Sequence, residues 1–192
     1  MQIVSQKKLY IKKEIEVEGD KMNKKSIVLI GFMGVGKTTI GKELAIKLQR
    51  GFIDIDEEIE KTYQMKTVDI FKEHGEKEFR RTEKELIKNA CAAEGKVISV
   101  GGGAFMQAET RNLCMENAIV LFLDLSWGYW KERLSILVDS RPILQGKNSN
   151  EIKELFLNRQ PIYEDHHIKI KVDDLSIQEA VEEITLELKR MK

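Results

Sequence analysis

The chain has 192 residues, of which 42% are apolar and 33% are charged, a balance typical of a globular protein with one sizeable core. Its 32 Lys and Arg residues are matched by 32 Asp and Glu residues, so the net charge does not favour a nucleic-acid or membrane partner. No apolar run approaches the roughly 20 residues that a membrane-spanning helix needs. Any binding of phosphate groups must therefore come from a local site.

The first 25 residues differ from the rest. They are rich in Lys and lack an apolar face of useful size, so residues 1–25 are expected to be a flexible N-terminal extension. A weak alternation over residues 9–17 leaves a short edge strand as the alternative. No signal or transit peptide pattern is found, and Cys91 and Cys114 lack metal-ligand spacing. We therefore expect a cytoplasmic protein with two reduced thiols in or near its core.

From residue 26 onward, short apolar runs alternate with amphipathic runs, which predicts one domain over residues 26–192. Strands are predicted over residues 26–30, 52–56, 96–100, 118–125 and 167–172. Helices are predicted over residues 37–49, 67–74, 76–93, 126–137 and 176–189. Thr67 and Ser126 are expected to cap their helices, and Gly75 to end the helix before it. Strands separated by helices imply an α/β fold, with a mostly parallel sheet covered on both faces.

A phosphate-binding loop follows the first predicted strand. Residues 31–38, GFMGVGKT, match G-x-x-x-x-G-K-[ST] in full and run into the first predicted helix. The glycines let backbone N–H groups approach an anion at the positive end of that helix. Lys37 adds a charge for the β- and γ-phosphates, and the Thr38 hydroxyl can bind Mg²⁺. The motif predicts binding of a nucleoside triphosphate and is silent on the acceptor.

Two aspartates follow at strand spacing, in the segment Phe52-Ile53-Asp54-Ile55-Asp56. On a strand, Asp54 and Asp56 would point to the same side. One carboxylate could hold Mg²⁺ through water, while the other accepts a hydrogen bond from a substrate hydroxyl and helps to deprotonate it. Capping of a helix that begins near Glu57 explains the pair equally well.

A second glycine cluster, Gly101, Gly102 and Gly103, follows the predicted strand 96–100. Residues without side chains let a small ligand approach the backbone at the carboxyl end of a strand. A flexible turn between strand and helix is the alternative.

Arginine is scarce beside lysine, so its placement is informative: Arg80 follows Phe79, Arg141 precedes Pro142, and Arg159 lies before Pro161. The guanidinium group suits bidentate binding of carboxylates and phosphates. For each arginine alone, a solvated surface position is the simpler interpretation.

Two further features are not expected to bear function. Asp124 ends the apolar run 119–123 and is expected beyond the sheet, beside Ser126 at the start of a helix. His166 and His167 are adjacent, so on a strand they would face opposite sides and could not share a metal ion.

Taken together, the motifs resemble those of the shikimate kinase family. The resemblance covers residues 25–192. It rests on five ordered segments, which are residues 31–38, residues 54–56, Phe79-Arg80 with Glu83, residues 101–103, and Arg141-Pro142-Ile143-Leu144 followed by Arg159 and Tyr163. It implies a three-layer αβα P-loop kinase fold, similar to nucleoside-monophosphate kinases, with a five-stranded parallel sheet in the order 2-3-1-4-5. It also implies substrate-binding helices over about residues 57–93 and a mobile lid over about residues 136–150.

The resemblance also implies roles for individual residues. ATP would be bound by Gly34, Val35, Gly36, Lys37, Thr38, Thr39, Arg133 and Arg141. Shikimate would be bound by Asp56, Arg80, Gly101, Gly102, Gly103 and Arg159. Mg²⁺ would be held by Thr38 and, through water, by Asp54. The catalytic residues would be Lys37, Asp56 as the base, and Arg141 from the lid.

The function implied is transfer of the γ-phosphoryl group of ATP to the 3-hydroxyl of shikimate, in aromatic amino-acid biosynthesis. Shikimate is an anionic polyol, and the arginines and Asp56 supply the cations and the acceptor that such a molecule needs. The sequence shows no long exposed apolar stripe, which favours a monomer, and its balanced charge favours neither a nucleic-acid nor a membrane partner. Two alternatives stay open: a kinase for another small acceptor such as gluconate or a nucleotide, and a P-loop protein that holds ATP without turnover.

Overall fold

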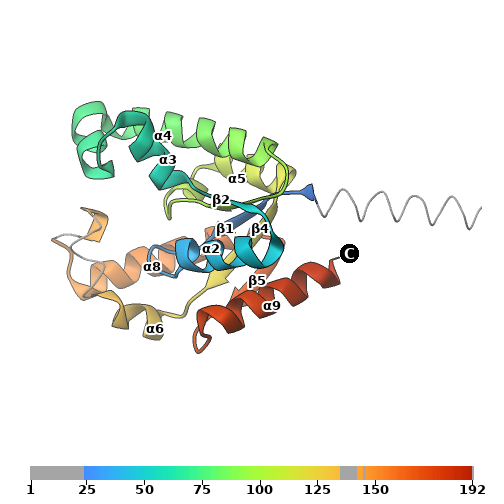
Figure 1. The fold of residues 1–192 in the computed structure, drawn as a ribbon. Helices are drawn as coiled ribbons and strands as arrows, with labels where there is room; N and C mark the ends of the chain where they lie inside the picture. Colours follow the sequence, from blue (N-terminus) through green and yellow to red (C-terminus); the bar gives the residue numbers. More distant parts are fainter. Residues whose placement is uncertain (1–23, 135–141, 145, 192) are drawn as a thin grey trace, which may run out of the picture.

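The computed structural model describes residues 24–134, 142–144 and 146–191. Its centre is a five-stranded sheet in which neighbouring strands run parallel in the order β2-β3-β1-β4-β5 (Figure 1). The strands are β1 (Ile27–Ile30), β2 (Gly51–Asp54), β3 (Lys96–Ser99), β4 (Ile119–Asp124) and β5 (Ile168–Lys171). The strand order that the family resemblance implies is therefore confirmed.

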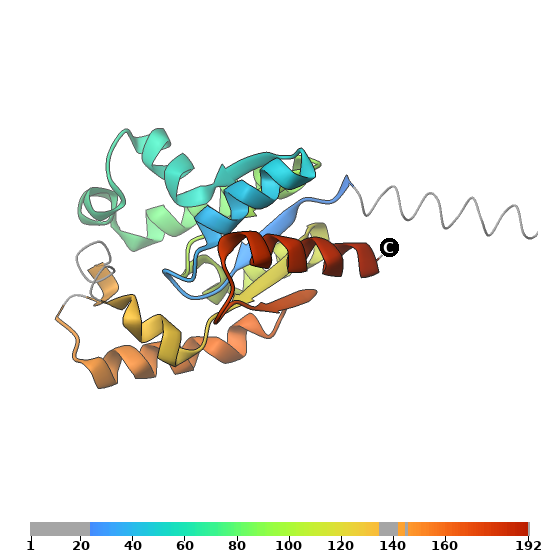
Figure 2. The same ribbon diagram turned by 60° about the horizontal axis from the view of Figure 1, so that its bottom comes forward.

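Helices cover both faces of this sheet. They are α2 (Lys37–Leu48), α3 (Ile55–Tyr63), α4 (Thr67–Ala92), α5 (Ala108–Asn117), α6 (Trp127–Glu132), α8 (Ser149–Tyr163) and α9 (Ile177–Arg190), with short 3-10 turns η1 (Ala104–Met106) and η2 (Pro142–Leu144). Helices α2 and α9 pack side by side on one face, and α4 and α5 pack together on the other (Figures 1 and 2). The result is the expected three-layer arrangement.

The strands differ in burial because they differ in position. Central strand β1 is fully buried and entirely apolar, as expected for a parallel strand with helices on both faces. Edge strand β5 alternates, with Ile168 and Ile170 buried and Lys169 and Lys171 exposed. The cysteines Cys91 and Cys114 are both buried and free, as predicted.

The predicted strand over residues 52–56 is too long. Strand β2 ends at Asp54, which is the N-cap of α3. The Asp54 Oδ1 atom accepts hydrogen bonds from the backbone N–H groups of Asp56 (3.1 Å) and Glu57 (3.3 Å). This capping turns the chain into a helix one residue later, so Asp56 lies in a first helical turn and not on a strand.

The predicted break at Gly75 is confirmed: its φ of 77° and ψ of 167° are not helical, so α4 consists of two helices that meet at this residue. The expected cap of the first of them is wrong. Thr67 is the first helical residue and not the cap, because Lys66 holds that position. The Thr67 backbone N–H and hydroxyl both donate to Glu60 Oε1, at 2.9 and 3.1 Å. The Glu60 carboxylate, from α3, therefore accepts the hydrogen bonds at the start of α4 that a capping side chain would otherwise accept.

Asp124 is also misplaced by the sequence analysis. It is the last residue of β4, opposite Lys171 in the register, and it forms an ion pair with Lys169 at 3.5 Å. Ser126 is the N-cap of α6, as predicted, although its side chain makes no capping hydrogen bond. The backbone N–H of Val172 donates to the Asp124 carbonyl oxygen at 2.9 Å, so Asp124 is paired with the neighbouring segment of the chain through its backbone.

Several predictions lie wholly or partly outside the described residues. The expected N-terminal extension falls almost entirely on residues 1–23, and the expected lid, with Arg141, falls in part on residues 135–141. Within the described ranges, no helix is both long and apolar enough to cross a membrane.

Candidate active site

The phosphate-binding loop, called the P-loop below (residues 31–38), connects the carboxyl end of β1 to α2. Gly31 has a φ of 140°, and a Cβ atom built on it would lie 2.6 Å from the Leu123 carbonyl oxygen. Gly36, the N-cap of α2, has a φ of 105°. Both conformations disfavour any residue with a side chain, and they turn the loop's N–H groups toward the space in front of the helix.

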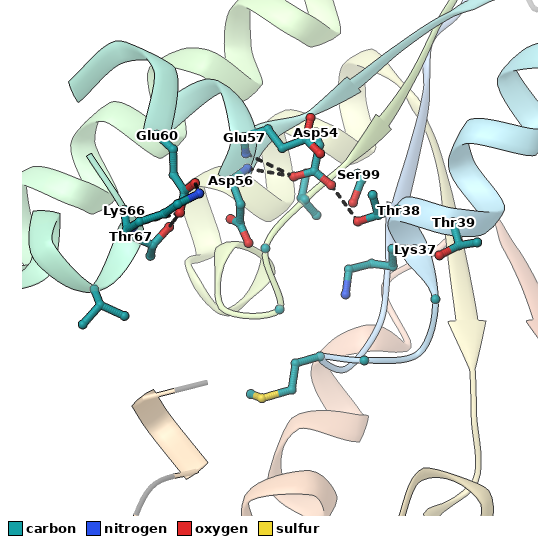
Figure 3. Close-up of a pocket in the computed structure, with 17 residues that line it drawn as sticks. Lys37, Thr38, Thr39, Asp54, Asp56, Glu57, Glu60, Lys66, Thr67 and Ser99 are labelled. Atoms are coloured by element: carbon teal, nitrogen blue, oxygen red, sulfur yellow. Dashed lines mark hydrogen bonds and ion pairs between the residues drawn. The ribbon is translucent and has the colours of Figure 1, made fainter. Parts of the chain in front are cut away.

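Lys37 is held within this loop. Its Nζ atom donates to the carbonyl oxygens of Gly31 (2.9 Å) and Phe32 (3.1 Å), and the residue is 8% exposed. Figure 3 shows its side chain pointing into the cleft. A buried cation beside a helix N-terminus gives the loop a strong preference for anions.

Thr38 and Asp54 are joined by a hydrogen bond from Thr38 Oγ1 to Asp54 Oδ2 at 2.7 Å (Figure 3). Asp54 is fixed from its other side, because its Oδ1 atom caps α3. Hydroxyl and carboxylate oxygens are the ligands that Mg²⁺ prefers, and in kinases it takes only one or two from the protein. Within the described ranges no group of three or more His, Cys, Asp or Glu residues could hold a metal ion, and this oxygen pair fits a magnesium that is shared with phosphates.

The cleft has two connected parts. A space of about 670 Å³ lies over the P-loop and reaches the α3–α4 junction, and a space of about 590 Å³ lies between α4, residues 101–103 and α8. Met33, Asp56, Gly101 and Gly102 line both parts. The P-loop and the predicted acceptor residues therefore face one continuous cleft.

Most of the predicted site residues line this cleft. At the P-loop end these are Gly34, Gly36, Lys37, Thr38, Thr39 and Asp54. At the other end they are Asp56, Arg80, Gly101, Gly102, Gly103 and Arg159. The side chain of Val35 does not line it and is buried beneath the loop.

Arg80 is oriented by two carboxylates on its own helix. Its Nη1 atom donates to Glu83 Oε2 at 2.7 Å, and its Nε atom donates to Glu76 Oε1 at 3.4 Å. Its guanidinium carbon lies 5.3 Å from the centroid of the Phe79 ring. Burial lowers the pKa of Arg80, but the two carboxylates outweigh it and the net pKa is raised. Arg80 is thus a permanent cation at the cleft wall.

Arg159 reaches the same end of the cleft from α8. Its Nη1 atom donates to the Gly102 carbonyl oxygen at 3.2 Å, and its guanidinium carbon lies 5.6 Å from the Phe32 ring centroid. Tyr163, one turn later, also donates to Gly102 O, at 3.0 Å. Two arginines from distant parts of the chain therefore flank the glycine cluster.

The glycine cluster provides space for its neighbours. A Cβ atom on Gly101 would lie 2.8 Å from Asp56 Oδ1, and one on Gly103 would lie 2.7 Å from Arg80 Nη2. Neither residue has a left-handed φ, so it is the close contacts with these side chains, and not the backbone conformation, that favour glycine here. A side chain at either position would displace a predicted substrate-binding group.

Glu83 is the most unusual group in the cleft wall. It is 1% exposed, and its Oε2 atom accepts from Arg80 and from Gln107 Nε2 (3.2 Å). Burial raises the pKa of Glu83 and the attraction of Arg80 lowers it, while Asp56 and Glu76 raise it further, so that it lies at about 7. A carboxyl group at this pKa changes its protonation state near neutral pH.

Two side chains at α6 donate hydrogen bonds to carbonyl oxygens of the P-loop, and the sequence pattern does not predict these contacts. Trp130 Nε1 donates to Met33 O at 2.6 Å, and Arg133 Nη1 donates to Gly34 O at 2.9 Å. The Trp130 ring packs edge-on against Phe32 at 5.0 Å between centroids. The sequence signal that could have indicated packing is the aromatic start of α6 directly after β4, but this signal does not identify the loop as the target.

Comparisons with known proteins agree with this geometry. A family model described as shikimate kinase matches residues 33–189. A shikimate kinase of Oceanobacillus iheyensis is 53% identical over 168 residues, covering 88% of this chain and 92% of the relative. The solved structure of Acinetobacter baumannii shikimate kinase in complex with shikimate superposes with a TM-score of 0.80 at 31% identity, covering 88% of this chain and 94% of that one. A gluconokinase of Sinorhizobium meliloti, at 20% identity and a TM-score of 0.52 over 87% of this chain and 93% of its own, shares the fold alone.

Proposed function

The chain belongs to the shikimate kinase family, and from that premise we propose how its residues divide the work of the reaction. The enzyme transfers the γ-phosphoryl group of ATP to the 3-hydroxyl of shikimate, giving shikimate 3-phosphate and ADP in aromatic amino-acid biosynthesis. These roles are supported above all by the continuous cleft. The P-loop lies at one end of it, Arg80 and Arg159 lie at the other, and Asp56 lines both parts.

The P-loop end holds the triphosphate. Its N–H groups cradle the phosphates, and Lys37 Nζ exchanges its loop carbonyl contacts for phosphate oxygens when ATP binds. Thr38 and, through water, Asp54 would hold Mg²⁺, which would neutralise the charge that develops on the phosphates. Arg133 serves the nucleotide from the rim of the loop, and its hydrogen bond to Gly34 O supports this role.

The other end holds shikimate by its carboxylate. Arg80 and Arg159 come from α4 and α8 and flank the same glycine cluster, so the planar carboxylate can be gripped from two sides. Burial of part of both guanidinium groups strengthens the attraction, because the local dielectric constant is low. This grip fixes the orientation of the ring and thereby of its hydroxyls.

Asp56 serves as the base. It lines both parts of the cleft and points into the pocket beside Lys37 (Figure 3), so its carboxylate can accept the proton of the attacking hydroxyl. Phosphoryl transfer needs positioning and charge neutralisation more than covalent chemistry, and the two ends of the cleft supply both. The role of Arg141 in a closing lid and the monomeric state stay predictions.

The direct test is an acceptor panel. The purified protein is incubated with ATP and Mg²⁺ plus shikimate, gluconate or a nucleoside monophosphate, and ADP release is followed together with the phosphorylated product. We expect shikimate to be phosphorylated with the highest kcat/KM. Gluconate as the better acceptor would overturn the acceptor assignment, and ATP binding without transfer to any acceptor would favour a protein that only holds the nucleotide.

A further inference from the structure

Glu83 has one oxygen atom that the described structure leaves without a hydrogen bond. Its Oε2 atom accepts from Arg80 and Gln107, whereas Oε1 is buried and has no hydrogen-bond partner within the described part of the chain. A buried charged oxygen without a donor is unfavourable, because burial removes its water and nothing replaces it. A proton on Oε1 removes that cost, because the group is then neutral and Oε1 becomes a donor.

The surroundings of Oε1 place it inside the acceptor end of the cleft. A Cβ atom on Gly101 would lie 3.2 Å from Glu83 Oε1 and 2.8 Å from Asp56 Oδ1. The two carboxyl groups, from α4 and α3, therefore approach the same point beside the backbone of Gly101. Like charges in such a space favour protonation of one of them.

Few charges in the described structure balance this pair. On α4, Glu83 faces Arg80 and Glu76, and across the cleft it faces Asp56 of α3; Gln107, between η1 and α5, is neutral. Arg159 of α8 lines the same pocket but donates to Gly102 O. Arg80 is thus the cation on which the charge of Glu83 depends.

Under the proposed function, on which this inference rests, Arg80 also receives the substrate carboxylate. We propose that Glu83 takes up a proton from solvent when shikimate binds to Arg80, so that acceptor binding is coupled to protonation of this buried carboxyl group. The new O–H bond forms at Oε1, on the side of the carboxyl group that faces the backbone of Gly101. Once Glu83 is neutral, the charge of Arg80 is available to the substrate carboxylate. The hydrogen bond from Arg80 to Glu83 Oε2 still orients the guanidinium group, so Glu83 is a positioning residue.

The affinity for shikimate is expected to fall as the pH rises through neutrality. Burial, opposed by Arg80 and assisted by Asp56 and Glu76, sets the pKa of Glu83 at about 7 in the empty cleft. An added substrate carboxylate raises this pKa further. Shikimate affinity is then constant below about pH 6.5 and falls above about pH 7.5, by up to tenfold per pH unit, until the pKa of the complex is reached.

The test is calorimetric titration of the full-length protein with shikimate at pH 7, in buffers of different ionisation enthalpy. The dependence of the observed heat on buffer gives the protons taken up. We expect roughly half a proton for the wild type, from a group whose pKa lies at about 7. The Glu83→Gln variant, which mimics the neutral acid, is expected to bind shikimate without proton uptake and with affinity independent of pH.

Two variants serve as controls. Glu76→Gln removes the other carboxylate that contacts Arg80, one whose side chain is 70% exposed, and is expected to retain most of the uptake. His74→Gln removes the histidine of α4, one of three in the chain, and is also expected to retain it.

The possible outcomes distinguish a failure of this inference from a failure of the proposed function. Shikimate binding with no uptake in the wild type, or with unchanged uptake in Glu83→Gln, overturns the inference but leaves the proposed function standing. No shikimate binding by the wild type contradicts the proposed function and the inference together. Should Glu83→Gln fail to fold, the wild-type affinity measured from pH 6 to pH 8.5 decides, because a flat profile overturns the inference.

Discussion

The two ends of the cleft are built in different ways. The phosphate-binding part of the nucleotide end is one continuous segment, the P-loop, whose cation Lys37 is held by carbonyl oxygens of the same loop. The acceptor end takes side chains from α3, α4 and α8 and packs them around residues 101–103. It also contains the buried carboxyl group of Glu83. Phosphate recognition is therefore local, whereas acceptor recognition depends on tertiary placement and on the charge balance of several elements.

The largest effect is expected from breaking the nucleotide end. Lys37→Ala removes the buried cation of the P-loop, so kcat is expected to fall by about 10³-fold or more. Steady-state kinetics with saturating shikimate measures this loss. Lys47→Ala, on the exposed side of the same helix where it pairs with Glu182, is the matched control and should keep normal turnover. A Lys37→Ala enzyme with near-normal kcat would remove the basis for a local phosphate site.

Breaking the base at the junction of the two ends is expected to have the next largest effect. Asp56→Asn keeps the shape of the side chain but removes the proton acceptor, so kcat should fall by about 10²-fold or more. ATP affinity, measured by calorimetry, should stay unchanged because the P-loop is intact. Glu58→Gln, on the same helix and paired with Lys61, controls for loss of a carboxylate from α3. Equal losses in Asp56→Asn and Glu58→Gln would argue for a general effect on the helix.

A smaller effect is expected from a change that disturbs only the acceptor end of the cleft. Gly103→Ala would place a Cβ atom 2.7 Å from Arg80 Nη2, so the arginine has to shift. We expect the KM for shikimate to rise about tenfold, the cost of a weakened charge-assisted hydrogen bond, while the KM for ATP is unchanged.

Gly128→Ala, in α6, is the matched control, because a Cβ atom there meets nothing within 4 Å. If Gly103→Ala raises the KM for both substrates equally, the two ends of the cleft are not separable as described.

The smallest effect is expected outside the cleft. Ser176 caps α9 in a capping box with Glu179, and Ser176→Ala should lower the free energy of unfolding by about 1 kcal/mol. Urea denaturation measures this change, and both KM values should stay as in the wild type. Gln178→Ala, an exposed neighbour, should leave stability nearly unchanged. A change in KM for Ser176→Ala would mean that scaffold and cleft are coupled.

The parts of the structure that could be predicted are those set by local sequence. The P-loop motif fixes its own conformation, and alternation of apolar and amphipathic runs indicates a parallel α/β sheet. The strand order came from the family resemblance, because periodicity alone does not order strands. For Asp54 two local interpretations competed: the capping of α3 is confirmed, and the metal role stays a prediction, although the same carboxylate also accepts from Thr38.

The parts that could not be predicted depend on distant contacts. The amphipathic pattern of α4 does not distinguish Glu83, fully buried beside Arg80, from the exposed Glu76 seven residues earlier. The contacts of Trp130 and Arg133 with P-loop carbonyls join residues 97 and 99 positions apart. Spacing in the sequence carries no information about such pairs.

A crystal structure with ADP and shikimate bound tests the central claim most directly. The account predicts the shikimate carboxylate between Arg80 and Arg159, and the 3-hydroxyl beside Asp56 and facing the P-loop. Shikimate bound with its carboxylate away from both arginines, or with Asp56 turned out of the cleft, would contradict it.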